Sequence, residues 1–131
     1  SSQEESVRRV AALMKLIRRE NPDLILVMSP LPSYELVAEQ PVDSALIRAL
    51  ARLPITREGG IQEECGLYQR LRELSAEQGW VFVDNLAALK AYHGTDRLYN
   101  DFDYHLLPVA SALVGKAQAT AILETLRNRA P

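Results

Sequence analysis

The amino-acid sequence predicts an α/β fold in which a parallel sheet is flanked by helices. Two short runs, residues 24–28 and 80–84, are apolar almost throughout, as are strands that are buried on both faces. Helical patterns stand before, between and after these runs, and this alternation favours parallel strands joined by a right-handed crossover. With 131 residues, 47% of them hydrophobic, the chain fits one domain over residues 1–131.

The first element is a predicted helix. Ser2 and Glu5 have the spacing of a capping box, which satisfies two of the backbone N–H groups at a helix start. Four apolar residues then recur at helical spacing: Val7, Val10, Met14 and Ile17. Asn21 and Pro22 end this helix before the first apolar run.

The middle of the chain alternates loops and a helix. Residues 29–34 include Pro30 and Pro32, which predict an extended loop at the carboxyl end of the first strand, where ligands usually meet open α/β sheets. Asp43 can cap a helix that Pro54 ends. Residues 55–60 contain two adjacent glycines and are predicted to be a loop.

Three helical segments follow. The first has an apolar face and is ended by Gly79; that face consists of Ile61, Cys65, Tyr68, Leu71 and Leu74. After the second strand, Asn85 is predicted to cap a short helix through Leu89. Pro108 suits the first turn of the last helix, whose packing face is rich in small residues: Ala110, Leu113, Ala117, Ala121 and Leu126.

The charge balance and the single cysteine narrow the function classes. Fifteen basic and seventeen acidic residues give a net charge of -2 without a basic block, which argues against nucleic acid and anionic membrane as partners. Cys65 cannot form an internal disulfide, and no cysteine/histidine ladder suggests zinc, so neither metal nor cofactor is expected. The polar start and the absence of a membrane-length apolar run predict a soluble chain, and export followed by leader removal would be compatible with it.

Two central strands make a very small sheet. Both predicted strands have the apolar character of interior strands, so their outer edges would lack partners. Either another chain or an N-terminal segment is therefore expected to supply neighbouring strands. The chain is interpreted as an incomplete domain.

The polar and aromatic stretch over residues 98–108 carries the clearest candidate chemistry. Asp103 and His105 stand two residues apart, directly before the last helix. A carboxylate can accept a hydrogen bond from one imidazole nitrogen and leave the other nitrogen ready to take a proton from a nucleophile. Such a pair would be the base half of a catalytic triad, although in an arbitrary loop an Asp-x-His is more often surface polarity or a cap.

The order of these pieces resembles the C-terminal part of SGNH/GDSL hydrolases. A helix runs into Asn21-Pro22-Asp23, an apolar strand ends in Ser29-Pro30-Leu31-Pro32, a second strand ends in Phe82-Val83-Asp84, and the Leu98–His105 loop precedes the final helix. The resemblance covers nearly the whole chain. It implies a flavodoxin-like sheet and a serine esterase or O-acyltransferase that acts on acyl esters, including esters of carbohydrate.

The same resemblance implies roles for individual residues. His105 would be the general base and Asp103 its orienting acid. The commonest family spacing, Asp-x-x-His, would place the acid at Phe102, so Asp103 fits a shorter variant similar to the alginate O-acetyltransferase-like branch, with Asp101 as the fallback acid.

The nucleophile that this family uses is missing from the sequence. No Gly-Asp-Ser, Gly-x-Asn-Asp or Gly-x-Ser-x-Gly segment occurs, and Ser29 and Ser33 are weak candidates beside the prolines of a turn. Because an Asp/His pair without a nucleophile and oxyanion donors is no acyl-transfer site, the chain alone is expected to be inactive. A missing N-terminal segment would supply the serine.

Other candidate residues can be explained by structural roles. Cys65 is predicted to be a buried, inert thiol, and His93 fits helix-end chemistry beside Gly94. Tyr99, Phe102 and Tyr104 could line an acyl or sugar pocket or pack the loop onto the last helix. The rival to the hydrolase hypothesis is a non-catalytic α/β module that uses the same scaffold for binding or assembly.

Overall fold

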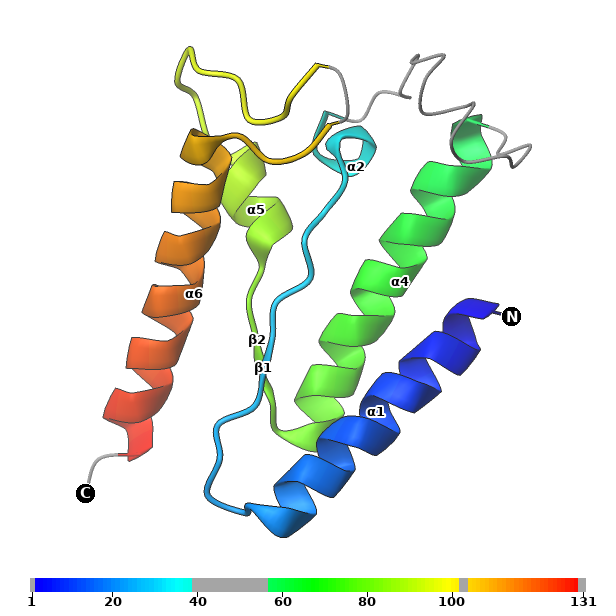
Figure 1. The fold of residues 1–131 in the computed structure, drawn as a ribbon, viewed down its shortest axis with the longest axis vertical. Helices are drawn as coiled ribbons and strands as arrows, with labels where there is room; N and C mark the ends of the chain where they lie inside the picture. Colours follow the sequence, from blue (N-terminus) through cyan, green and yellow to red (C-terminus); the bar gives the residue numbers. More distant parts are fainter. Residues whose placement is uncertain (1, 39–56, 102–103, 130–131) are drawn as a thin grey trace.

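The computed structural model describes residues 2–38, 57–101 and 104–129, and it is a mixed α/β structure with mostly helical elements (Figure 1). The elements in chain order are α1 (Ser2–Glu20), β1 (Val27–Met28), α2 (Tyr34–Ala38), α4 (Arg57–Gln78), β2 (Val81–Phe82), α5 (Asn85–Lys90) and α6 (Pro108–Arg129). None of these helices combines the length and the apolar character that crossing a membrane requires, within the described ranges.

Strands β1 and β2 form a parallel pair, as the sequence predicts. Val27 pairs with Val81 and Met28 with Phe82, and the N–H of Val83 donates to the carbonyl of Met28 at 2.9 Å. Each strand is shorter than its apolar run in the sequence. Figure 1 shows α6 on one side of this pair and α4 with α1 on the other.

Two apolar clusters hold the helices onto the strands. One cluster joins α1, α4 and the strands, and its buried members are Val7, Leu74 and Trp80. The other lies between α5, α6 and the loop before α6, and its buried members are Leu89, Tyr99, Ala110 and Val114. The first cluster includes Leu26 and Met28 of the β1 segment, whereas the second gathers residues of α2, α5, α6 and the loop before α6.

Helix α4 ends in the motif that the sequence predicts at Gly79. Gly79 adopts φ +69°, and the N–H of Trp80 donates to the carbonyl of Ser75 at 2.9 Å, which is the six-to-one hydrogen bond of a Schellman motif. Because Trp80 is the residue before β2, this bond sets the direction in which the chain enters the strand.

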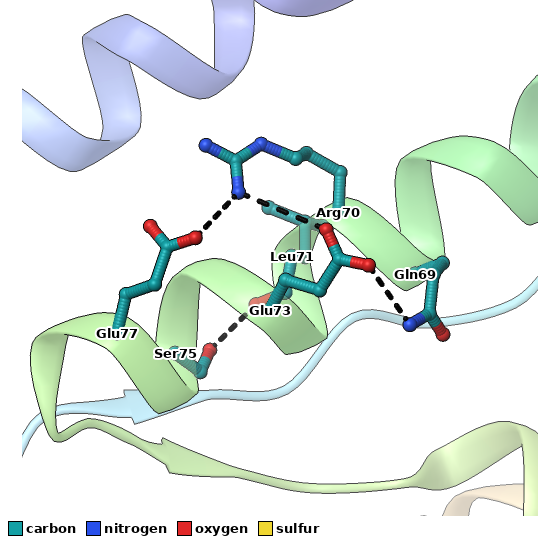
Figure 2. A network of polar contacts seen from close by, with 6 residues as sticks. All are labelled: Gln69, Arg70, Leu71, Glu73, Ser75 and Glu77. Carbon is teal, nitrogen blue, oxygen red and sulfur yellow. Dashed lines mark hydrogen bonds and ion pairs between the residues drawn. The ribbon is translucent and has the colours of Figure 1, made fainter.

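The outer face of α4 is polar (Figure 2). Arg70 Nη1 lies 3.1 Å from Glu77 Oε1 and 3.9 Å from Glu73 Oε2, and Gln69 Nε2 donates to Glu73 Oε1 at 3.1 Å. On the buried side, the Ser75 hydroxyl donates to the carbonyl of Leu71 at 2.7 Å. Exposed pairs of this kind add only a few tenths of a kcal/mol each, about 0.2–1, so α4 is held mainly by its apolar face.

Two sequence expectations about this region were wrong, and a third is not tested by the described residues. Cys65 is exposed, because the buried side of α4 is centred near Leu71 and Cys65 lies about 120° around the helix from it at ~3.6 residues per turn. Residues 57–60 are the first turn of α4 and no loop, while Ile55 and Thr56 lie outside the described residues. The helix expected between Asp43 and Pro54 also lies outside them.

Two other local features differ from the expectations. The cap of α5 is Asp84, whose carboxylate accepts from the N–H of Ala87 at 3.0 Å, and Asn85 is the first residue of the helix. Residue Tyr34, expected in an extended loop, begins the short helix α2, whose start is capped by the Ser33 hydroxyl with the N–H of Leu36 at 3.3 Å.

Helix α6 begins at Pro108 as expected, and its packing face lies nearer its start than expected. Ala110 and Val114 are buried, whereas Leu126, placed by the periodicity on the same face, is 48% exposed. The helix thus extends beyond the sheet that it covers.

Candidate functional site

The loop that carries His105 is a small hairpin before α6. Tyr99 and Leu106 form an antiparallel bridge, and the N–H of Asn100 donates to the carbonyl of His105 at 2.8 Å. Tyr104 adopts φ +55°, a left-handed conformation that tightens the turn. The backbone of His105 is therefore fixed, and its side chain is exposed.

Of the two acidic partners predicted for His105, the structure describes only Asp101. Asp103 and Phe102 lie outside the described residues, so the pairing of Asp103 with His105 stays a prediction. Asp101, the fallback acid, is exposed and forms an ion pair with Arg97. The contacts of Asp101 thus direct it towards Arg97.

The hairpin is anchored to the segment that leaves β1. The Tyr99 hydroxyl donates to the carbonyl of Pro32 at 2.7 Å, and this side chain is buried. The Tyr34 ring packs edge-on against Tyr99, with centroids 5.8 Å apart, and tilted against Tyr104, at 4.8 Å. Burial, with the nearby carboxylate of Glu64, raises the pKa of Tyr99 to about 12. The His105 loop is therefore held at the carboxyl end of the parallel strands.

A cavity of about 650 Å³ lies beside this hairpin. Four of the five tyrosines in the chain line it: Tyr34, Tyr92, Tyr99 and Tyr104. Charged side chains also belong to its wall, among them Lys90, Arg97 and Asp101. His105 is not among the described lining residues, although its neighbour Tyr104 is. The sequence left open whether these tyrosines pack the loop or line a pocket. Tyr99 and Tyr104 do both.

Ser29 is part of a partly buried polar network. Its hydroxyl oxygen accepts from Asn85 Nδ2 and from Gln118 Nε2, each at 2.9 Å, and Asn85 Nδ2 also donates to the carbonyl of Pro30 at 2.9 Å. Asn85 is fully buried, and its Oδ1 has no hydrogen-bond partner among the described residues. These bonds tie β1, α5 and α6 together, which is a structural role for Ser29.

Ser33 is likewise held by a partner distant in sequence. Its hydroxyl donates to Glu64 Oε2 at 2.5 Å and its N–H donates to Glu64 Oε1 at 2.7 Å. Neither Glu64 nor Gln118 belongs to a motif that sequence reasoning could have found. Asn85 offered one weak signal, since it directly follows the second strand and its aspartate.

Asp84 lies just after β2 and contacts the two helices α4 and α5. Its Oδ1 accepts from the Tyr68 hydroxyl at 3.0 Å, and its Oδ2 lies 2.6 Å from Arg72 Nη2. Burial alone would raise the pKa of Asp84, but hydrogen bonds from Ala87, Arg72 and Tyr68 outweigh it, so the pKa is lowered. Burial raises the pKa of Tyr68 to about 12, and the Asp84 charge adds to this. Both groups keep their usual charge states at neutral pH.

The remaining candidates do not gather into a second site. His93 is exposed and lies three residues beyond the end of α5. Across the part of the chain that the structure describes, His, Cys, Asp and Glu side chains form no group of three that could hold a metal ion. Asp103 lies outside that part.

Comparison with protein-family models, with curated proteins and with solved structures gave no match to this chain.

Proposed function

We propose that this chain provides the histidine half of a serine esterase or O-acyltransferase site of the SGNH type. In this proposal His105 is the general base, Asp103 orients it, and a segment N-terminal to residue 1 supplies the serine nucleophile. The domain is then an incomplete flavodoxin-like sheet, and acyl esters, including those of carbohydrate, are the substrates.

The observation that carries the proposal is the position of the His105 hairpin. The bond from Tyr99 to the carbonyl of Pro32 anchors the hairpin to the segment after β1, at the carboxyl end of parallel strands. That end is where open α/β sheets bind their ligands. An exposed imidazole on a fixed backbone there is accessible to a nucleophile from a neighbouring loop.

The chemistry would be acyl transfer in two steps. In the first, the serine oxygen bonds to the acyl carbon while its proton passes to the ring nitrogen of His105 that does not face Asp103, and the alcohol of the ester leaves with that proton. In the second, water or a sugar hydroxyl gives its proton to His105 and its oxygen bonds to the acyl carbon, while the bond from that carbon to the serine oxygen breaks and His105 returns the proton to the serine. Asp103 would hold the ring and stabilise its positive form throughout.

Neither serine beside the carboxyl end of β1 suits the role of nucleophile. The oxygen of Ser29 already accepts two hydrogen bonds, and the hydroxyl of Ser33 donates to Glu64 while capping α2. An activated serine needs a general base as its hydrogen-bond partner. The bonds of Ser33 to Glu64 and to the start of α2 are structural instead. This supports placing the nucleophile in another segment.

The test uses the polypeptide translated from the complete reading frame and a fluorophosphonate probe, which labels activated serines. We expect labelling of a single serine upstream of residue 1, and loss of labelling in His105→Ala. His93→Ala is the matched control, because His93 is the other histidine of the chain and is also exposed. Labelling that persists in His105→Ala, or that is absent from the complete polypeptide, would refute the proposal.

A non-catalytic module is the second candidate. The observation that favours it is the packing of Tyr34 against Tyr99 and Tyr104, which gives the hairpin residues a structural role without any chemistry. For such a module, we expect a stably folded complete polypeptide that the probe does not label.

A further inference from the structure

The outer face of α6 is apolar although it is exposed. Helix α6 lies at the margin of the fold and contacts α5 and β2 along one side, where Ala110 and Val114 are buried (Figure 1). The opposite side carries five exposed residues within an arc of roughly 80°, at about 100° per residue. We call these residues the outer stripe, and they are Ala112, Gly115, Ala119, Leu123 and Leu126. No charged residue of α6 falls within this arc. A helix that is apolar on two opposite sides usually packs on both.

The outer stripe changes in size along the helix. Its first three residues are alanine and glycine, and its last two are Leu123 and Leu126, which are 51% and 48% exposed. A Cβ added at Gly115 would meet nothing within 4 Å, so the space outside the first half is open. Because the cores of protein interfaces are closely packed, an occupant must be large opposite the first half and small opposite the second.

A second copy of α6 that runs in the opposite direction has this shape. We consider two antiparallel helices related by a two-fold axis through the middle of the stripe. Leu126 is then level with the stretch between Ala112 and Gly115 of the second copy, and Leu123 with the stretch between its Gly115 and Ala119. Each leucine thus fits between two small residues, as a knob fits into a hole.

The charges beside the outer stripe give the same axis. Lys116 and Glu124 both line the cavity between α6 and β2, and so lie on the same side of the stripe. They stand four residues before and after Thr120, so an axis at Thr120 sets Lys116 level with Glu124 of the second copy, and the reverse pair forms by symmetry. Arg127, three residues after Glu124, leaves this carboxylate between two basic groups. Parallel helices would instead bring like charges together.

We propose that two copies of the chain form a dimer through the outer stripes of α6, with the two helices antiparallel and the two-fold axis at Thr120. The interface lies on the side of α6 turned away from α5 and β2, and it makes no demand on the sheet edges or on a serine. It is therefore independent of the proposed function. Because the His105 hairpin directly precedes α6, the two hairpins lie at opposite ends of the helix pair.

Sedimentation equilibrium of the 131-residue chain tests the dimer. We expect a dimer for the wild type and a monomer for Leu123→Asp/Leu126→Asp. Leu13→Asp/Leu16→Asp is the matched control, because these α1 leucines have similar exposed fractions, 57% and 54%, and this variant should remain dimeric. Far-UV circular dichroism shows that each variant is folded. A wild type that is monomeric at its highest soluble concentration, association that survives the α6 variant, or association that the α1 control also abolishes would overturn the inference.

Exchange of charges tests the antiparallel register. Lys116→Glu alone and Glu124→Lys alone each set like charges opposite one another, and each should raise the dissociation constant of the dimer at least about tenfold. The double variant Lys116→Glu/Glu124→Lys should restore wild-type affinity. A mixture of the two single variants should form heterodimers, since every contact then joins opposite charges. Single variants that associate as the wild type does, or a double variant no tighter than the single ones, would overturn this register.

A larger residue in the small half tests the packing. Gly115→Leu should leave the monomer folded, because the space around Gly115 is open. In the dimer the new side chain would occupy the place of Leu126 of the second copy, so the dissociation constant should rise at least about tenfold. An unchanged dissociation constant would show that the leucines do not pack against the small half, and would overturn the inference.

Discussion

Asp84 shows how one side chain can organise a junction between several elements. It caps α5 through Ala87, accepts from Tyr68 on α4 and pairs with Arg72 on the same helix. Arg72 in turn lies over the Phe82 ring, with its guanidinium carbon 5.1 Å from the ring centroid. The carboxylate therefore joins the end of β2 to both flanking helices.

Substituting Asp84 separates the roles of the cap and of the charge. Asp84→Ala should lower the free energy of unfolding by about 1–2 kcal/mol, because a helix cap and a hydrogen bond of Tyr68 are lost. Asp84→Asn should lower it less, since asparagine also caps helices. Urea unfolding at neutral pH measures both values.

The charge of Asp84 also predicts a pH dependence. Its pKa is lowered in the folded state, so the carboxylate stabilises the fold above its unfolded-state pKa, and this contribution is lost as the pH falls through the lowered folded-state value. The stability difference between the wild type and Asp84→Asn should therefore shrink in acid. A difference that is constant between neutral and acidic pH would show that the charge contributes nothing.

At the scale of elements, Gly79 joins α4 to β2 with a conformation that suits glycine alone. Gly79→Ala should lower the free energy of unfolding by about 1–2 kcal/mol, because a Cβ is strained at φ +69°. Gly66→Ala is the control within the same helix, where the added Cβ meets nothing within 4 Å, and it should raise stability by about 0.5–1 kcal/mol. Thermal or urea unfolding that gives both variants the same sign would contradict this assignment.

Elements with local signals could be predicted from the sequence, and those held by distant partners could not. Gly79 and Pro108 marked the end of α4 and the start of α6, because each residue type has a backbone preference of its own. Helix α2 was missed because its first turn is fixed by Glu64, 31 residues from Ser33. The sequence put Cys65 on the buried side of α4, but Cys65 is exposed. Periodicity shows how wide an apolar face is, but not which of its residues lies at the centre of the contact with the sheet.

At the scale of the whole molecule, the parallel order of the strands followed from the alternation of elements, whereas the surroundings of the candidate site did not. No sequence pattern indicates that Tyr34 meets Tyr99 and Tyr104, 65 and more residues away, or that Gln118 reaches Ser29. These contacts depend on how the two ends of the chain fold onto one sheet. The position of His105 could be predicted only as far as the carboxyl side of that sheet.

The two apolar clusters involve different helices, and their coupling decides whether the chain unfolds as one domain. Leu89, 1% exposed, belongs to the α5–α6 cluster, and Trp80, the single tryptophan, belongs to the α1–α4 cluster. Leu89→Ala should lower the free energy of unfolding by about 2–5 kcal/mol, because it removes buried methyl groups and leaves a cavity.

If the 131 residues form one cooperative domain, Leu89→Ala must also shift the unfolding transition that Trp80 fluorescence reports. That transition must have the same midpoint as the one measured by far-UV circular dichroism. The control is Leu16→Ala, at a position that is 54% exposed, which should change the free energy by no more than about 0.5 kcal/mol. A variant in which circular dichroism is lost first, while the Trp80 transition keeps its wild-type midpoint, would show that the sheet does not couple the clusters. In that case the His105 hairpin, which shares the cluster of Leu89, could unfold without α1 and α4.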